Sequence, residues 1–137
     1  MTDFIYPVRV YYEDTDAGGV VYYANYLKFM ERARTEMLRL AGFEQDAIRD
    51  EDGVVFAVRH ASIDYARAAR FNDLLQVTAN IIKMGKASLV FQHAVTLHDE
   101  PETLLCEATV KIACVNADTF QVCPIPETIR TELTRVN

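Results

Sequence analysis

The segment RVYYEDTDAGGVVYYANY, residues 9–26, holds the residue types best suited to chemistry. It places Glu13, Asp14 and Asp16 in a loop with Gly18 and Gly19, directly before a predicted helix. Backbone N–H groups at a helix start are unpaired and carry partial positive charge, so they can hold a developing oxyanion. A carboxylate beside such donors can act as base or nucleophile on a carbonyl. An acidic, glycine-containing turn that caps a helix is the commoner explanation, so these residues alone do not establish catalysis.

The elements around this loop follow from the spacing of apolar residues. A strand is predicted at Pro7–Tyr12, before the loop, because it is rich in Val and Tyr. A long helix is predicted after it, from about Tyr23 to Ala41, with Gly42 at its C-terminal cap. The residues expected on its buried face recur at spacings of three and four: Tyr26, Met30, Ala33, Met37 and Leu40.

Beyond residue 53 the period changes to two, which predicts four long strands at 54–69, 74–84, 87–99 and 103–116. The third is the clearest, because Leu89, Phe91, His93 and Val95 alternate with polar residues. Short turns between the strands indicate antiparallel neighbours. Residues 43–53 are expected to be a short helix or loop, and the prolines at 124–127 to open a short C-terminal helix.

These elements predict an α+β fold, one long helix on a five-stranded antiparallel sheet, in a single domain over residues 1–137. One helix covers only part of one face of such a sheet. The other face and an edge need cover, so we expect a homo-oligomer.

Composition excludes several classes. The net charge of −6 disfavours binding to nucleic acid or an anionic membrane. No apolar run approaches the ~20 residues that span a bilayer, and no export signal is evident, so we expect a cytoplasmic protein without membrane insertion. The three cysteines and three histidines lack metal-ligand spacing. We therefore expect reduced thiols, structural histidines, and no metal or cofactor; these residues are Cys106, Cys114, Cys123, His60, His93 and His98.

The loop segment also resembles the active-site signature of the 4-hydroxybenzoyl-CoA thioesterase family. The matching positions are Arg9-Val10, Thr15-Asp16, Gly19, Val20, Val21, Tyr23 and Asn25-Tyr26. The stretches YYEDTDAGGVVY and ERARTEML resemble the YbgC-type branch, bacterial acyl-CoA thioesterases associated with the Tol-Pal system. Weaker resemblance continues through SLVF and EATVKIACV, over nearly the whole chain.

This resemblance implies a hotdog fold, a helix wrapped by a curved antiparallel sheet, and hydrolysis of acyl-CoA thioesters without a cofactor. It implies that Asp16 is the catalytic carboxylate, as base or nucleophile. It implies that the backbone N–H of Tyr23 polarises the thioester carbonyl and that Glu31 contacts the acyl group. Some YbgC-type members have His in place of Tyr23, which favours a backbone role over a side-chain role at this position.

Other residues have less defined roles. Gly19 and Asn25 are candidates for binding substrate, although Asn25 could equally tie down the loop. Glu31 could instead pair with Arg34. Coenzyme A carries phosphates that need basic partners, and the best candidates are Lys83 and Lys86, followed by Arg67 and Arg70.

Two other functions stay open on the same fold. One is a non-catalytic module that binds acyl-CoA or acyl carrier protein for a membrane-associated complex. Asp16 favours the enzyme, because a pure binder needs no carboxylate at the reacting carbon. The other is a dehydratase, which would use a catalytic His, and the segment contains none. The family resemblance further implies a dimer or tetramer, and we expect each pocket to use residues from two chains.

Overall fold

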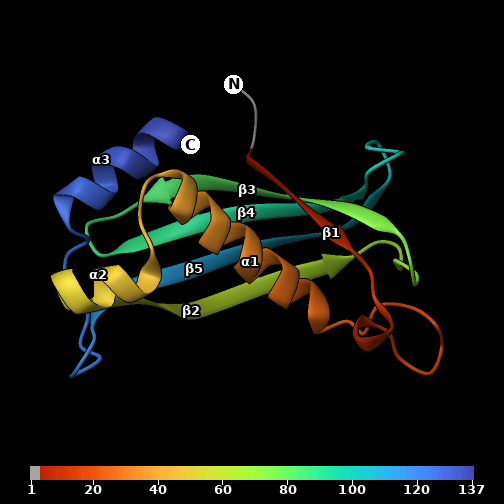
Figure 1. Cartoon of the computed structure of the whole chain (residues 1–137), viewed down its shortest axis with the longest axis horizontal. Coiled ribbons are helices and arrows are strands. Elements are labelled where there is room, and N and C mark those ends of the chain that lie inside the picture. The colour runs from red at the N-terminus through yellow and green to blue at the C-terminus, as the bar shows by residue number, and fades with distance from the viewer. Residues whose placement is uncertain (1–3) are drawn as a thin grey trace.

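A curved five-stranded antiparallel sheet lies against one long helix (Figure 1). This computed structural model describes residues 4–137. The strands are ordered β1-β3-β4-β5-β2 across the sheet, so β1 and β2 form its edges. This arrangement confirms the predicted α+β hotdog architecture. The elements are β1 (Phe4–Arg9), a single 3₁₀ turn (Tyr12–Asp14), α1 (Asn25–Leu40), α2 (Gln45–Asp52), β2 (Val54–Tyr65), β3 (Leu74–Met84), β4 (Ser88–Leu97), β5 (Leu104–Asn116) and α3 (Glu127–Val136).

The apolar face of α1 packs on the inner face of the sheet. Met30, Ala33 and Met37 are fully buried, as their spacing predicted. The prediction for Leu40 was wrong, because its side chain is 59% exposed. The buried stripe advances in steps of four at this end of the helix, from Ala33 to Met37 to Ala41, so Leu40 falls on its solvent side.

The two faces of the sheet differ in polarity. Alternate side chains of β4 point inward, and Leu89, Phe91, His93 and Val95 are all buried, as predicted. Cross-strand partners on the outer face form a polar row: Asn80, Gln92, Thr109 and Ser62. The outer face is therefore polar along this row. The edge of β2 is unpaired within residues 4–137, with Val58 55% and Tyr65 44% exposed.

Several boundaries differ from those predicted. Strand β1 ends at Arg9, and Tyr12 instead begins the 3₁₀ turn. Helix α1 begins at Asn25 rather than Tyr23, because the N–H of Asn25 donates to the Tyr22 carbonyl in a tight turn (2.8 Å). Strand β2 ends at Tyr65 rather than residue 69. The residues after it turn away, as two successive N–H groups there donate to one carbonyl, that of Leu105.

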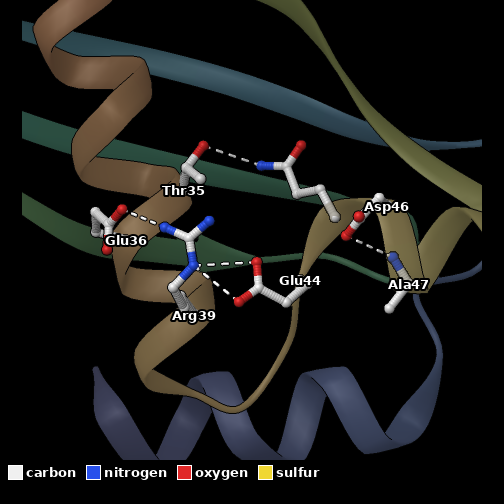
Figure 2. A network of polar contacts seen from close by, with 7 residues as sticks. Thr35, Glu36, Arg39, Glu44, Asp46 and Ala47 are labelled. Atoms are coloured by element: carbon white, nitrogen blue, oxygen red, sulfur yellow. Dashed lines mark hydrogen bonds and ion pairs between the residues drawn. The ribbon is translucent and has the colours of Figure 1, made fainter.

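Polar side chains link the C-terminal half of α1 to the start of α2 (Figure 2). Arg39 donates from Nε to both carboxylate oxygens of Glu44, at 2.9 and 3.0 Å, and also pairs with Glu36. The Gln45 amide donates to the Thr35 hydroxyl at 3.1 Å. These exposed pairs contribute little free energy. They do hold α2 beside the C-terminal half of α1, where a cavity described below opens.

His93 lies in the interior between α1 and the sheet and is fully buried. Its Nδ1 lies 2.8 Å from the Thr78 carbonyl oxygen, and its Nε2 lies 3.0 Å from Nη1 of Arg34. An Nδ1–H tautomer satisfies both contacts, because it donates to the carbonyl and accepts from the guanidinium. Burial lowers the pKa of His93 to about 4, and the neighbouring Arg34 charge adds to this effect. The hydrogen bond to the Thr78 carbonyl raises the pKa and offsets only part of the change.

This buried histidine makes stability depend on pH. The unfolded chain binds a proton near pH 6.5, whereas folded His93 does so only near pH 4, so stability falls as pH drops through this window. We expect His93→Gln, which can keep both hydrogen bonds, to reduce the wild-type loss between pH 7 and pH 5 by about 2 kcal/mol. Urea unfolding at the two pH values measures this. If wild type and variant lost the same free energy of unfolding between pH 7 and pH 5, folded His93 would already bind its proton in this range.

Candidate active site

The motif loop is a closed hairpin. Thr15 and Val21 form an antiparallel bridge across its base, and the N–H of Asp16 donates to the Val20 carbonyl at 2.9 Å. The N–H of Gly19 returns to the Asp16 carbonyl at 3.0 Å. Gly19 has φ +79°, a left-handed conformation that favours glycine. Gly19, which was predicted to contact substrate, therefore has a structural role in this turn.

The Asp16 side chain is exposed at the tip of this hairpin. Its Oδ1 accepts a hydrogen bond from the Gly18 N–H at 2.8 Å, which fixes the carboxylate relative to its own loop. A Cβ at position 18 would lie 3.2 Å from that same oxygen, so glycine suits the close approach. The second oxygen has no hydrogen-bond partner among residues 4–137 and is free to face a substrate.

Asn25 and Asp14 tie the loop to the start of α1. The Asn25 amide donates to the Asp14 carbonyl at 2.8 Å, and the Tyr22 N–H donates to the same oxygen at 2.9 Å. Asn25 is only 8% exposed. The Asp14 carboxylate accepts from the Tyr11 N–H at 2.9 Å. Of the two roles open for Asn25, this geometry supports tying down the loop, and Asp14 likewise acts within the loop.

Tyr23 lies in the turn that leads into α1, two residues before the helix begins. Its N–H has no acceptor within residues 4–137, and no side chain caps this helix end. Its carbonyl accepts from the Tyr65 hydroxyl at 3.0 Å, which ties the turn to the end of β2. Its phenol ring is 61% exposed and meets Tyr65 edge-on. The structure thus leaves the Tyr23 amide available as a donor.

A pocket of about 320 Å³ opens beside Tyr23, between the helix start and the segment after β2. Tyr65 and Arg67 line it. The N–H of Ala69 donates to the buried Tyr26 hydroxyl at 3.0 Å, so this segment is anchored to α1. Sequence reasoning did not find Tyr65, which lies 42 positions from the carbonyl it contacts. Tyr65 lies outside the motif of residues 9–26, so no sequence pattern pointed to it.

A second cavity, of about 110 Å³, lies between α1, α2 and the first half of β2; we call it the α1–α2 cavity. Glu31 and Arg34 line it, together with Thr35, Gln45 and mostly apolar side chains. Glu31 is exposed and forms no ion pair with Arg34 within 4.0 Å. The helix therefore brings Glu31 to a cavity, at some distance along α1 from the Asp16 loop of the same chain.

The two lysines predicted to bind phosphate lie far from Asp16 in one chain. Lys83 is near the end of β3, whereas the first residue of that strand, Leu74, pairs with Arg9, the first residue of the motif. The nine steps from Leu74 to Lys83, at ~3.3 Å each, separate the two by roughly 30 Å. Lys86 lies in the turn after β3, and both lysines are exposed. Of the basic residues considered, Arg67 is the one that lines the pocket beside Tyr23.

Metal clusters and reactive thiols were the other sites considered in the described residues. No group of three His, Cys, Asp or Glu side chains within residues 4–137 could hold a metal ion. Cys106, Cys114 and Cys123 are free thiols. Burial raises the pKa of Cys106 and Cys114 to about 12, so neither is a thiolate nucleophile at neutral pH. No described helix has the length and apolarity to cross a membrane.

Comparison with known proteins identifies the family of this chain. The family model described as "Thioesterase-like superfamily" matches residues 10–133. A Shigella flexneri protein named "Acyl-CoA thioester hydrolase YbgC" is 46% identical over 131 residues, 96% of either chain. A Haemophilus influenzae "Acyl-CoA thioesterase YbgC" is 42% identical over 127 residues, 93% of this chain and 91% of its own.

The chain belongs to the thioesterase-like superfamily, in the group of the YbgC proteins. The crystal structure of a "Probable Thioesterase" from Bartonella henselae superposes on this thioesterase-like chain with a TM-score of 0.85. That protein is 33% identical, and the match covers 91% of this chain and 100% of its own. The resemblance first noted in the motif loop therefore extends over the complete sheet and helix.

Proposed function

We propose that this protein is an acyl-CoA thioesterase, which cleaves the thioester bond of acyl-coenzyme A. The observation that carries the proposal is a free carboxylate oxygen on a hydrogen-bonded loop that leads into an uncapped helix start, in a chain that belongs to the thioesterase-like superfamily. Water activated by Asp16 attacks the carbonyl, or Asp16 itself attacks it and forms a mixed anhydride that water then hydrolyses to the free acid and the Asp16 carboxylate. The Tyr23 N–H stabilises the oxyanion, and coenzyme A leaves as thiolate.

The unpaired edge of β2 supports a further proposal, that two chains form one site. The end of β2 touches the Tyr23 turn, whereas its first half lines the α1–α2 cavity. If two β2 edges pair antiparallel about a two-fold axis, each chain's Tyr23 end lies beside the other chain's cavity. Glu31 of one chain then lies at the same end of the joined sheet as Asp16 of the other.

The proposed β2-paired dimer also suggests how coenzyme A would be bound. It brings Lys83 and Lys86 of one chain to the same end of the joined sheet as the other chain's Asp16 loop, where CoA phosphates would need them. An acyl carrier protein is an alternative carrier of the same thioester. We place the single domain in the cytoplasm, where acyl-CoA is available and its three thiols stay reduced. Association of two dimers would give a tetramer.

Asp16→Asn is the first test, since it keeps the shape of the side chain and removes its charge. We expect kcat on the best acyl-CoA to fall by roughly 10²–10⁴ with little change in stability, because a positioned base or nucleophile is lost. Glu13→Gln, in the same loop and also exposed, is the matched control and should keep wild-type kcat. A near-wild-type kcat for Asp16→Asn would refute the mechanism. Tight binding of acyl-CoA by a wild type without turnover would indicate the binding module instead.

Tyr23 variants separate the backbone donor from the side chain. Tyr23→Phe should lose little activity, and Tyr23→Ala should keep most of it, because both retain the N–H. Tyr23→Pro removes the N–H without breaking a hydrogen bond within residues 4–137, so kcat should fall by roughly 10²–10³. Circular dichroism and sedimentation check that each variant folds and assembles. If Tyr23→Phe were as damaging as Asp16→Asn, the hydroxyl would be the catalytic group.

Assembly through β2 predicts a dimer or tetramer of the 15.6 kDa chain in sedimentation at micromolar concentration. Val58→Glu should shift it toward monomer and lower activity, because a charge would be buried in the contact between strands. Val122→Glu is matched in exposure, at 55% for each valine, lies off the β2 edge, and should leave the dimer intact. A fully active wild-type monomer would contradict both the assembly and the shared site.

A further inference from the structure

Arg34 is the one guanidinium of the described chain that lines the α1–α2 cavity. It projects from α1 into a space whose other walls are largely apolar, among them Phe56, Leu89 and Phe91. It forms no ion pair with a carboxylate of residues 4–137 within 4.0 Å. A cation in largely apolar surroundings is costly unless something accepts its hydrogen bonds. Burial lowers the pKa of Arg34, and the charge of Glu31 offsets only part of this effect.

His93 satisfies only part of this need. Its Nε2 accepts from Arg34 Nη1 at 3.0 Å, and its Nδ1 is held by the Thr78 carbonyl, so the pair has a fixed geometry. Phe91 stacks on the imidazole with ring planes 4° apart. A guanidinium has five N–H donors, and the others have no acceptor among the described side chains. No described buried side-chain nitrogen is left without a partner, so these donors reach open space.

We propose that Arg34, positioned by His93, selects acyl groups whose far end carries an acceptor oxygen. The inference rests on the proposed thioesterase function, in which the α1–α2 cavity receives the acyl group of a thioester attacked from the second chain. The cavity holds several times the space of one water molecule, enough for the end of a short acyl group. Its apolar walls contact the methylenes, and the guanidinium binds the terminal oxygen.

A hydroxyl and a carboxylate share this chemistry. Glu31 also lines the cavity, and its negative charge opposes a second anion. An end hydroxyl avoids that repulsion, whereas an end carboxylate can form two parallel hydrogen bonds with the guanidinium. The test therefore needs both oxygen-bearing ends beside an apolar end of similar length.

The experiment measures kcat/KM of the purified protein on hexanoyl-CoA, 5-hydroxypentanoyl-CoA and glutaryl-CoA. We expect wild type to prefer at least one oxygen-bearing substrate over hexanoyl-CoA by roughly tenfold or more. Arg34→Met should abolish the preference, measured as the ratio of kcat/KM values for the oxygen-bearing substrates over hexanoyl-CoA within that variant. Arg34→Lys keeps the positive charge but lacks the planar set of guanidinium N–H donors, so it should retain part of the preference. It also provides a test if Arg34→Met fails to fold.

Matched variants distinguish selection from general damage. Arg32→Met changes an exposed arginine of the same helix and should keep the wild-type preference. His93→Leu should lose the preference, whereas His93→Gln should retain it, because glutamine can still accept from Arg34. A wild type that hydrolyses hexanoyl-CoA equally well, or an Arg34→Met that keeps the preference, would overturn this inference alone. Failure of wild type to hydrolyse any acyl-CoA would instead refute the proposed function.

Discussion

Burial of the apolar face of α1 against the inner face of the sheet is the constraint on which this structure depends. Phe29, Met30, Ala33 and Met37 are at most 1% exposed, and each methylene buried with them contributes ~0.8 kcal/mol. The same contact sets where the helix begins. Because its buried face holds the 16-residue helix α1 in place on the sheet, the position of its first residue is fixed. The motif loop leads directly into that residue.

Several hydrogen bonds tie the start of α1 to the motif loop and to the end of β2 with the segment after it. The Asn25 amide binds the Asp14 carbonyl, the Tyr65 hydroxyl binds the Tyr23 carbonyl, and the Tyr26 hydroxyl accepts from Ala69. Each joins segments between 11 and 43 positions apart in the chain. Asp16 is thus on an exposed loop without being free to move independently, which suits a carboxylate that must meet a carbonyl at hydrogen-bond distance.

Much of this could be predicted from the sequence, because strand and helix periods are local signals. The alternation of β4 and the motif from Arg9 to Tyr26 indicated the sheet and the family. The start of α1 was misplaced by two residues, because a turn bond between Tyr22 and Asn25 decides it and apolar spacing does not report such bonds. The pairing of Arg34 with His93 joins residues 59 positions apart and has no signature in one sequence.

The Arg34–His93 pair in the α1–α2 cavity and the exposed edge of β2 are related through the proposed dimer. Within one chain the motif loop lies at the start of α1, whereas the α1–α2 cavity lies along the middle and C-terminal part of that helix. Antiparallel pairing of β2 would reverse one chain relative to the other and so place loop beside cavity. In that arrangement the apolar walls fix the depth of the acyl group, and Arg34 decides which end group is tolerated there. Attack geometry and acyl selection would then belong to different chains, so residues of the cavity could change between relatives without disturbing the loop that carries Asp16.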